Sequence, residues 1–157
     1  MSKEEKQVFI GIDVSKKELE VALRPLGVRS VFSNNEDGIV LLVDFVMSFL
    51  PVLVVLEATG GLQAGVVGAL AAKKCPVVVV NPRQVRDFAK ATGKLAKTDS
   101  IDAHVLAHFA EAVRPEVRAL KDVDAQNLDA LNTRRSQIVE MLTAEKNRLI
   151  MAPSWTR

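Results

Sequence analysis

The fold class follows from residues 52–80, which read VLVVLEATGGLQAGVVGALAAKKCPVVVV. Two short runs of valine and leucine, Val52–Leu56 and Val77–Val80, lie on either side of a stretch that predicts a helix over Leu62–Lys74. Uninterrupted apolar strands separated by a helix are typical of a parallel sheet covered by helices on both faces. The sequence therefore predicts an α/β domain with parallel strands at its centre.

The residues on either side of this stretch complete the sheet. Val8–Val14 is apolar and rich in β-branched residues, Glu18–Arg24 alternates at the strand period, and Val28–Ser33 follows a Pro-Leu-Gly turn. An amphipathic helix is expected over Glu36–Leu50 and another over Pro82–Ala91. The predicted order is βββαβαβα, a mixed sheet in which antiparallel hairpins precede parallel crossovers.

Two more helices are expected after the sheet. One runs from about Asp99 to Ala112, before Pro115, and a long one covers Asp124–Ile150. We therefore divide the chain into a domain over residues 1–115 and a helical extension over 116–157. The long helix either packs on its own domain or pairs with a second copy as a coiled coil. In the second case the predicted dimer interface is its heptad seam, with the apolar residues Leu128, Leu131, Ile138, Leu142 and Leu149.

Composition excludes several classes of protein. A chain of 157 residues with 48% apolar and 25% charged residues is typical of a soluble globular domain. Cys75 is the only cysteine, which excludes a disulfide framework, indicates a reducing compartment and predicts a buried small hydrophobe. Residues 38–56 carry one charge, yet Pro51 separates a helix from a strand there, so no membrane span is expected. With 4% aromatic residues and no tyrosine, a stacking platform for single-stranded nucleic acid is disfavoured.

Four acidic residues occupy positions where a solvated carboxylate is unexpected. Asp13 lies near the end of the first strand, and Glu57 directly follows the first valine-leucine run. Asp99 and Asp102 are three residues apart at a predicted helix start, which would place them on one helical face. Each also has a purely structural interpretation, because Asp is common at helix N-termini and acids often end strands before a turn.

Together the four acids predict a metal site. The carboxyl ends of neighbouring parallel strands meet at one edge of a sheet, where ligands of open α/β sheets gather. Carboxylates so close together repel one another unless cations compensate them. Mg²⁺ prefers oxygen ligands of this kind, and a pair of such ions stabilises both the attacking and the leaving oxygens of a phosphodiester.

A basic strip lies between the last strand and the acidic pair. Residues 82–98 hold five basic residues against the single acid Asp87, and the strip is either a solvated face or a phosphate-binding surface. His104 and His108 have the spacing of a helical zinc pair, but the sequence lacks the accompanying Glu, which favours a structural role. The predicted nucleic-acid contacts are Lys16, Arg83, Arg86, Lys90, Lys94 and Lys97.

These motifs resemble a known family. The segments are GIDVSK at 11–16, LEATG at 56–60, VNP at 80–82, VRDFA at 85–89, AKTD at 96–99 and IDA at 101–103. In this order they resemble the N-terminal domain of the DEDD-type insertion-sequence transposases, a family that includes the pilin-gene inverting recombinases. The resemblance covers residues 8 to about 150. Two departures are Leu62, where an aromatic is common, and Ser100, which replaces a frequent basic residue.

The resemblance implies an RNase H-like (RuvC-like) domain whose four acids hold Mg²⁺, with Mn²⁺ as a possible substitute. Asp13, Glu57, Asp99 and Asp102 match the family's D-E-D-D set. In the family a coiled coil follows, which is similar to 124–150 here, and then a C-terminal transposase domain with a serine nucleophile. A structured bridge RNA selects donor and target DNA. By this resemblance the chain is a truncated form without that last domain, inactive alone, from a prokaryotic cytoplasm and associated with the nucleoid when acting.

Three functions remain open from the sequence. The leading hypothesis is the metal-binding catalytic half of an RNA-guided DNA transposase or recombinase that forms a homo-oligomer. A stand-alone RuvC-like resolvase or nuclease would use water as its nucleophile. A non-catalytic RNA-binding and dimerisation module would need no metal. An actin-like ATPase is disfavoured because no glycine follows Asp13 closely.

Overall fold

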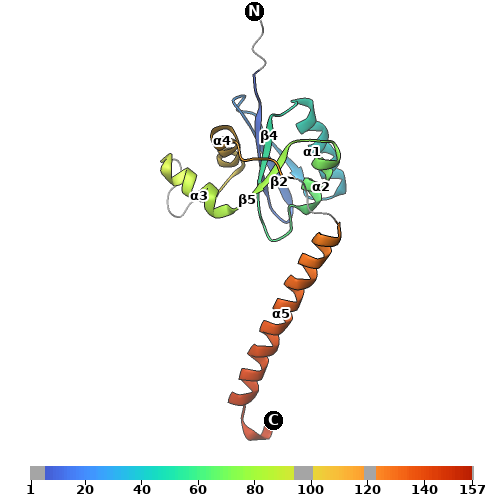
Figure 1. Ribbon diagram of the computed structural model, residues 1–157, viewed down its shortest axis with the longest axis vertical. Coiled ribbons are helices and arrows are strands. Elements are labelled where there is room, and N and C mark those ends of the chain that lie inside the picture. Colours follow the sequence, from blue (N-terminus) through green and yellow to red (C-terminus); the bar gives the residue numbers. More distant parts are fainter. Residues whose placement is uncertain (1–5, 94–100, 119–122, 157) are drawn as a thin grey trace, which may run out of the picture. The chain divides into compact units, whose positions relative to one another are not determined.

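The computed structural model describes residues 6–93, 101–118 and 123–156, and the side chains of 6–93, 101–118 and 130–155 (Figure 1). The chain divides into two compact units, Met1–Arg118 and Ala119–Arg157, which are described in turn. The first unit contains a five-stranded sheet, and the second contains one long helix.

The sheet is mixed, as the sequence predicts. Its strand order is β3-β2-β1-β4-β5, with β1 antiparallel to β2, β2 antiparallel to β3, and β1, β4 and β5 parallel to one another. The hairpins β1–β2 and β2–β3 therefore form one half, and the crossover strands form the other. The strands are β1 (Phe9–Val14), β2 (Glu18–Arg24), β3 (Arg29–Ser33), β4 (Leu53–Glu57) and β5 (Val77–Val80).

Helices cover both faces of the sheet (Figure 1). On one face α1 (Glu36–Ser48) and α2 (Ala64–Ala72) pack on a core that contains Ile10, Leu56 and Cys75. On the other face α3 (Pro82–Ala91) and α4 (Ala103–Val113) pack on Phe9 and Val55. Cys75 is buried, as predicted, and burial raises the pKa of its thiol to about 11.

One predicted helix start is wrong. The helix expected from about Asp99 begins at Ala103, and Asp102 precedes it in extended backbone as the N-cap. The Asp102 carboxylate accepts a hydrogen bond from the Val105 backbone N–H at 2.9 Å. Asp102 therefore caps the helix and does not lie inside its first turn. Asp99, the predicted helix start, lies outside the described residues.

Two other predicted helices are shorter than expected. The one predicted over Leu62–Lys74 begins at Ala64, because the Gln63 side chain accepts hydrogen bonds from the backbone N–H groups of Thr59 and Gly61 and so holds a turn there. The helix predicted over Glu36–Leu50 ends at Ser48. Neither difference moves a predicted site residue.

The second unit contains α5 (Val123–Met151), a helix of 29 residues, and a short 3₁₀ turn, η1 (Ser154–Thr156). Its predicted seam residues Leu131, Ile138, Leu142 and Leu149 are each at least half exposed. The side chain of Leu128 lies outside those described. Among the helices that the structure describes, none is both long enough and apolar enough to cross a bilayer.

Candidate metal centre

Two predicted ligands come together at the carboxyl ends of β1 and β4. The last parallel pair in the register is Ile12 with Leu56, so Asp13 and Glu57 follow side by side on neighbouring strands. Ile12 and Leu56 both belong to the core beneath α1 and α2. Because side chains alternate along a strand, Asp13 and Glu57 point to the opposite face, where α4 lies. The sequence predicts that these two acids lie at the same edge of the sheet, and the parallel register of β1 and β4 places them there.

Gly11 brings the third acid to the same place. A Cβ added at Gly11 would overlap the Ala103 carbonyl oxygen and the Ala107 backbone nitrogen, so α4 lies directly on β1. Ala103 and Ala107 are fully buried against β2. This close approach requires a residue without a side chain on the strand. It places the first turn of α4, with its N-cap Asp102, next to Asp13.

The electrostatics are those of crowded carboxylates. Burial raises the pKa of the Asp13 carboxyl above its ordinary value, and the negative charges of Glu20 and Asp102 raise it further. Burial likewise raises the pKa of Glu57, and Asp13 adds to this effect, whereas the Arg86 guanidinium opposes it. Asp13 and Glu57 therefore resist ionisation, first because they are partly buried and second because other acids face them, and a bound cation would relieve both effects.

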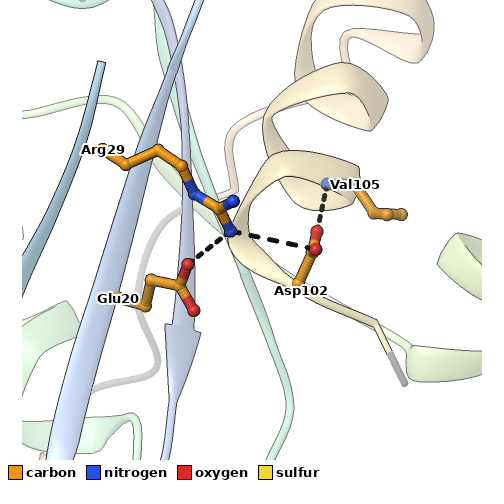
Figure 2. A network of polar contacts seen from close by, with 4 residues as sticks. All are labelled: Glu20, Arg29, Asp102 and Val105. Carbon is orange, nitrogen blue, oxygen red and sulfur yellow. Dashed lines mark hydrogen bonds and ion pairs between the residues drawn. The ribbon is translucent and has the colours of Figure 1, made fainter. Parts of the chain in front are cut away.

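Two residues at this site do not follow from the sequence prediction. Glu20 on β2 pairs directly with Asp13 across the β1–β2 hairpin. Arg29 at the start of β3 donates a hydrogen bond to Glu20 Oε1, and its Nη2 lies 3.9 Å from Asp102 Oδ2. Figure 2 shows the guanidinium lying between the two carboxylates. The alternation within Glu18–Arg24 could have indicated Glu20, because it places this residue on the face of the strand opposite Leu19 and Val21.

The donor chemistry fits a hard divalent cation. Asp13, Glu57 and Asp102 offer carboxylate oxygens, which Mg²⁺ and Mn²⁺ prefer. Within the described ranges 6–93 and 101–118, no three acidic, histidine or cysteine side chains are close enough to hold an ion together. Asp99 is outside those ranges, and Arg29 lies against one of the candidate ligands. Asp13, Glu57 and Asp102 therefore fit the ion by the chemistry of their oxygen donors, and metal binding by them and by Asp99 stays a prediction.

The described residues among the predicted nucleic-acid contacts lie on α3 and in the turn after β1. Arg83 and Lys90 on α3 are exposed, Arg86 is half-buried and faces Glu57, and Lys16 is exposed in the tight turn between β1 and β2. Lys94 and Lys97 lie outside the described residues. A hollow of about 330 Å³ between α3 and α4 adjoins Asp102, and its lining includes Phe88, Thr92, His104 and His108. Arg86 thus brings positive charge to one acid of the site, and the hollow adjoins another.

The chain is similar in sequence to known proteins. A family model for the DEDD transposases of the IS110 group, described as "Transposase", matches residues 10–152. Pilin gene-inverting proteins of Moraxella lacunata and Moraxella bovis are each 25% identical over 148 residues, which is 90% of this chain and 46% of theirs. The chain thus spans about half the length of these curated relatives.

A solved structure is similar in fold. It is T. thermophilus RuvC in complex with a Holliday junction substrate, with a TM-score of 0.50 and 16% identity over 68% of this chain and 96% of that one. The predicted RNase H-like (RuvC-like) class is confirmed by this likeness and by the strand order β3-β2-β1-β4-β5.

Proposed function

Because the chain belongs to the DEDD transposase family, we propose that its first unit is the metal-dependent nuclease half of a DNA transposase or recombinase. The observation that carries this proposal is the meeting of Asp13 and Glu57 at the ends of β1 and β4, with the Asp102 end of α4 held there by Gly11. Carboxylates from separate segments converge where an α/β sheet binds its ligands.

The acids hold the metal in this proposal. Asp13, Glu57 and Asp102, together with the predicted fourth ligand Asp99, bind Mg²⁺, for which Mn²⁺ substitutes. When bound, Mg²⁺ supplies Lewis-acid polarisation of the scissile phosphate and neutralises the charge that develops on it. Arg83, Arg86, Lys90 and Lys16 contact phosphates of the nucleic-acid backbone on either side, with Lys94 and Lys97 as further predicted contacts.

Other parts of the reaction lie beyond the residues of this site. We propose that DNA is the substrate, that a structured bridge RNA selects the donor and target sequences, and that a serine in a separate C-terminal domain is the nucleophile. The pilin gene-inverting relatives, which are about twice as long as the matched region, support a two-part enzyme. The reaction would take place in the prokaryotic cytoplasm on nucleoid DNA.

Glu57→Gln tests the metal site. In calorimetric titration of the EDTA-stripped chain with MnCl₂, this change is expected to weaken binding about tenfold or more, because it removes one charged ligand while keeping the shape. The matched control is Glu140→Gln, an exposed glutamate on α5, which should bind as the wild type does. Equal affinity for Mn²⁺ in the wild type and in Glu57→Gln would contradict the proposal.

The second unit is proposed to join two copies. The exposed apolar residues of α5 recur at heptad spacing, which is typical of a coiled-coil seam. Leu131→Asp with Leu142→Asp is expected to convert a dimer into a monomer in sedimentation equilibrium, since both changes place charges on the seam. Ser136→Asp with Gln137→Asp puts two aspartates elsewhere on the helix and should leave the dimer intact. A wild-type monomer at high concentration would refute this assignment.

A further inference from the structure

Among the ion pairs of the described residues, Arg29 is the one basic residue that contacts a candidate metal ligand. It begins the edge strand β3 and pairs in register with Ala22 on β2. On this antiparallel ladder its side chain shares a face with Glu20, two residues from Ala22. The guanidinium therefore extends along the sheet surface to Glu20 and on to the N-cap of α4.

The two oxygens of Asp102 have different partners. Oδ1 accepts the Val105 backbone N–H at 2.9 Å and so caps the helix. Oδ2 faces Arg29 Nη2 at 3.9 Å (Figure 2). Oδ2, which takes no part in the cap, is the oxygen that Arg29 approaches. A divalent cation bound at Oδ2 would therefore meet the positive charge of Arg29.

Glu20 keeps Arg29 at this position. Its carboxylate accepts the hydrogen bond from Arg29 and lies directly across from Asp13, so it adds negative charge at the site. The Arg29 side chain is 53% exposed, so its ion pairs are screened by water and displacing it costs little. Arg29 can therefore serve as the counter-ion of Asp102 when no metal is bound, and a metal ion can displace it at little cost.

We propose that Arg29, anchored by Glu20, is the resident counter-ion of Asp102 and competes with the divalent cation for its free oxygen. This inference rests on the proposed metal site. Arg29 is a positioning residue in this account, since it acts on the metal through Asp102 and not on the reacting phosphate. Its removal leaves the acids more negative and the ligand oxygen open, so metal binding becomes tighter.

The test compares arginine variants of the full 157-residue chain. After EDTA treatment, free Mn²⁺ is followed by electron paramagnetic resonance during titration with MnCl₂. Arg29→Gln is expected to bind Mn²⁺ about fivefold more tightly than the wild type, the size of an exposed ion pair. Arg29→Lys keeps the charge and is expected to stay within about twofold of the wild type, because charge and not fork geometry causes the competition.

Arg24→Gln is the matched control. Arg24 also lies on the sheet and pairs with an α4 acid, but its partner Glu111 is near the other end of that helix, with Nε to Oε2 at 2.8 Å. This change removes the same charge without touching Asp102, so its affinity for Mn²⁺ should equal that of the wild type. A similar gain in Arg24→Gln would mean that net charge alone is responsible, which overturns the role of Arg29.

The outcomes separate this inference from the function on which it rests. If Arg29→Gln binds Mn²⁺ no more tightly than the wild type while Glu57→Gln weakens binding, the metal site stands and the counter-ion role is refuted. If Glu57→Gln also has no effect, the ion binds elsewhere and both proposals fail. The melting temperature of metal-free Arg29→Gln verifies that the variant is folded.

Discussion

Gly11→Ala is expected to lower the free energy of unfolding by about 3 kcal/mol or more, and to unfold the first unit if its stability is modest. The new Cβ would overlap two backbone atoms of α4, the Ala103 carbonyl oxygen and the Ala107 nitrogen. Backbone atoms in a helix have no rotamer that avoids the clash. The whole of α4 must therefore move away from β1, which opens the core around Leu106.

Gly68→Ala is the matched control for this change. Gly68 lies in the interior of α2, is exposed, and has nothing near the place where a Cβ would be added. Alanine there is expected to stabilise the fold by about 0.5–1 kcal/mol, because glycine is a poor helix former. Denaturant unfolding of both variants measures the difference, and a Gly11→Ala midpoint equal to the wild type would refute the close packing of α4.

Asp13→Asn is expected to abolish metal binding and, without metal, to stabilise the chain. Because the pKa of Asp13 is raised in the folded state, the folded chain holds this proton more tightly than the unfolded chain does. Wild-type stability therefore falls as the pH rises from the unfolded value of 3.8 through the raised folded value. Asparagine has no such loss, since it has no charge that burial penalises or that Glu20 and Asp102 repel.

The measurement is the melting temperature in EDTA across pH. The difference between Asp13→Asn and the wild type should be near zero at about pH 4 and reach a few degrees at about pH 8. MnCl₂ should raise the wild-type melting temperature and leave Asp13→Asn unchanged, because only the folded wild type binds the ion. Asp44→Asn, an exposed acid on α1, serves as the control. A variant that still gains stability with Mn²⁺ would show that Asp13 is no ligand.

The strands could be predicted because each is marked by its own residues. The runs Leu53–Leu56 of β4 and Val77–Val80 of β5 are apolar throughout, which is typical of parallel strands, and β2 alternates as a strand of an antiparallel hairpin does. The same apolar runs identified Asp13 and Glu57 as acids at strand ends. Their position side by side could be predicted because neighbouring parallel strands end at the same edge of a sheet.

The start of α4 could not be predicted, because Asp99 and Asp102 are both suitable N-caps. In the structure Ile101 is buried in the core beside Leu106 and Phe109, and the chain reaches Asp102 in extended backbone. Burial of Ile101 is a tertiary contact, so the local pattern does not distinguish the two starts. The choice matters, because it makes Asp102 the cap and leaves one of its oxygens facing Arg29.

By itself, the sequence determined which elements form, their mixed order and which acids end the central strands, because these depend on burial patterns within short segments. The tertiary structure decided the membership of the site. Glu20 and Arg29 join it only because the β1–β2 and β2–β3 registers bring them to Asp13 and Asp102. Such contacts join residues that are distant along the chain, and their register depends on how the hairpins and α4 pack against one another, for which Gly11 leaves the necessary space.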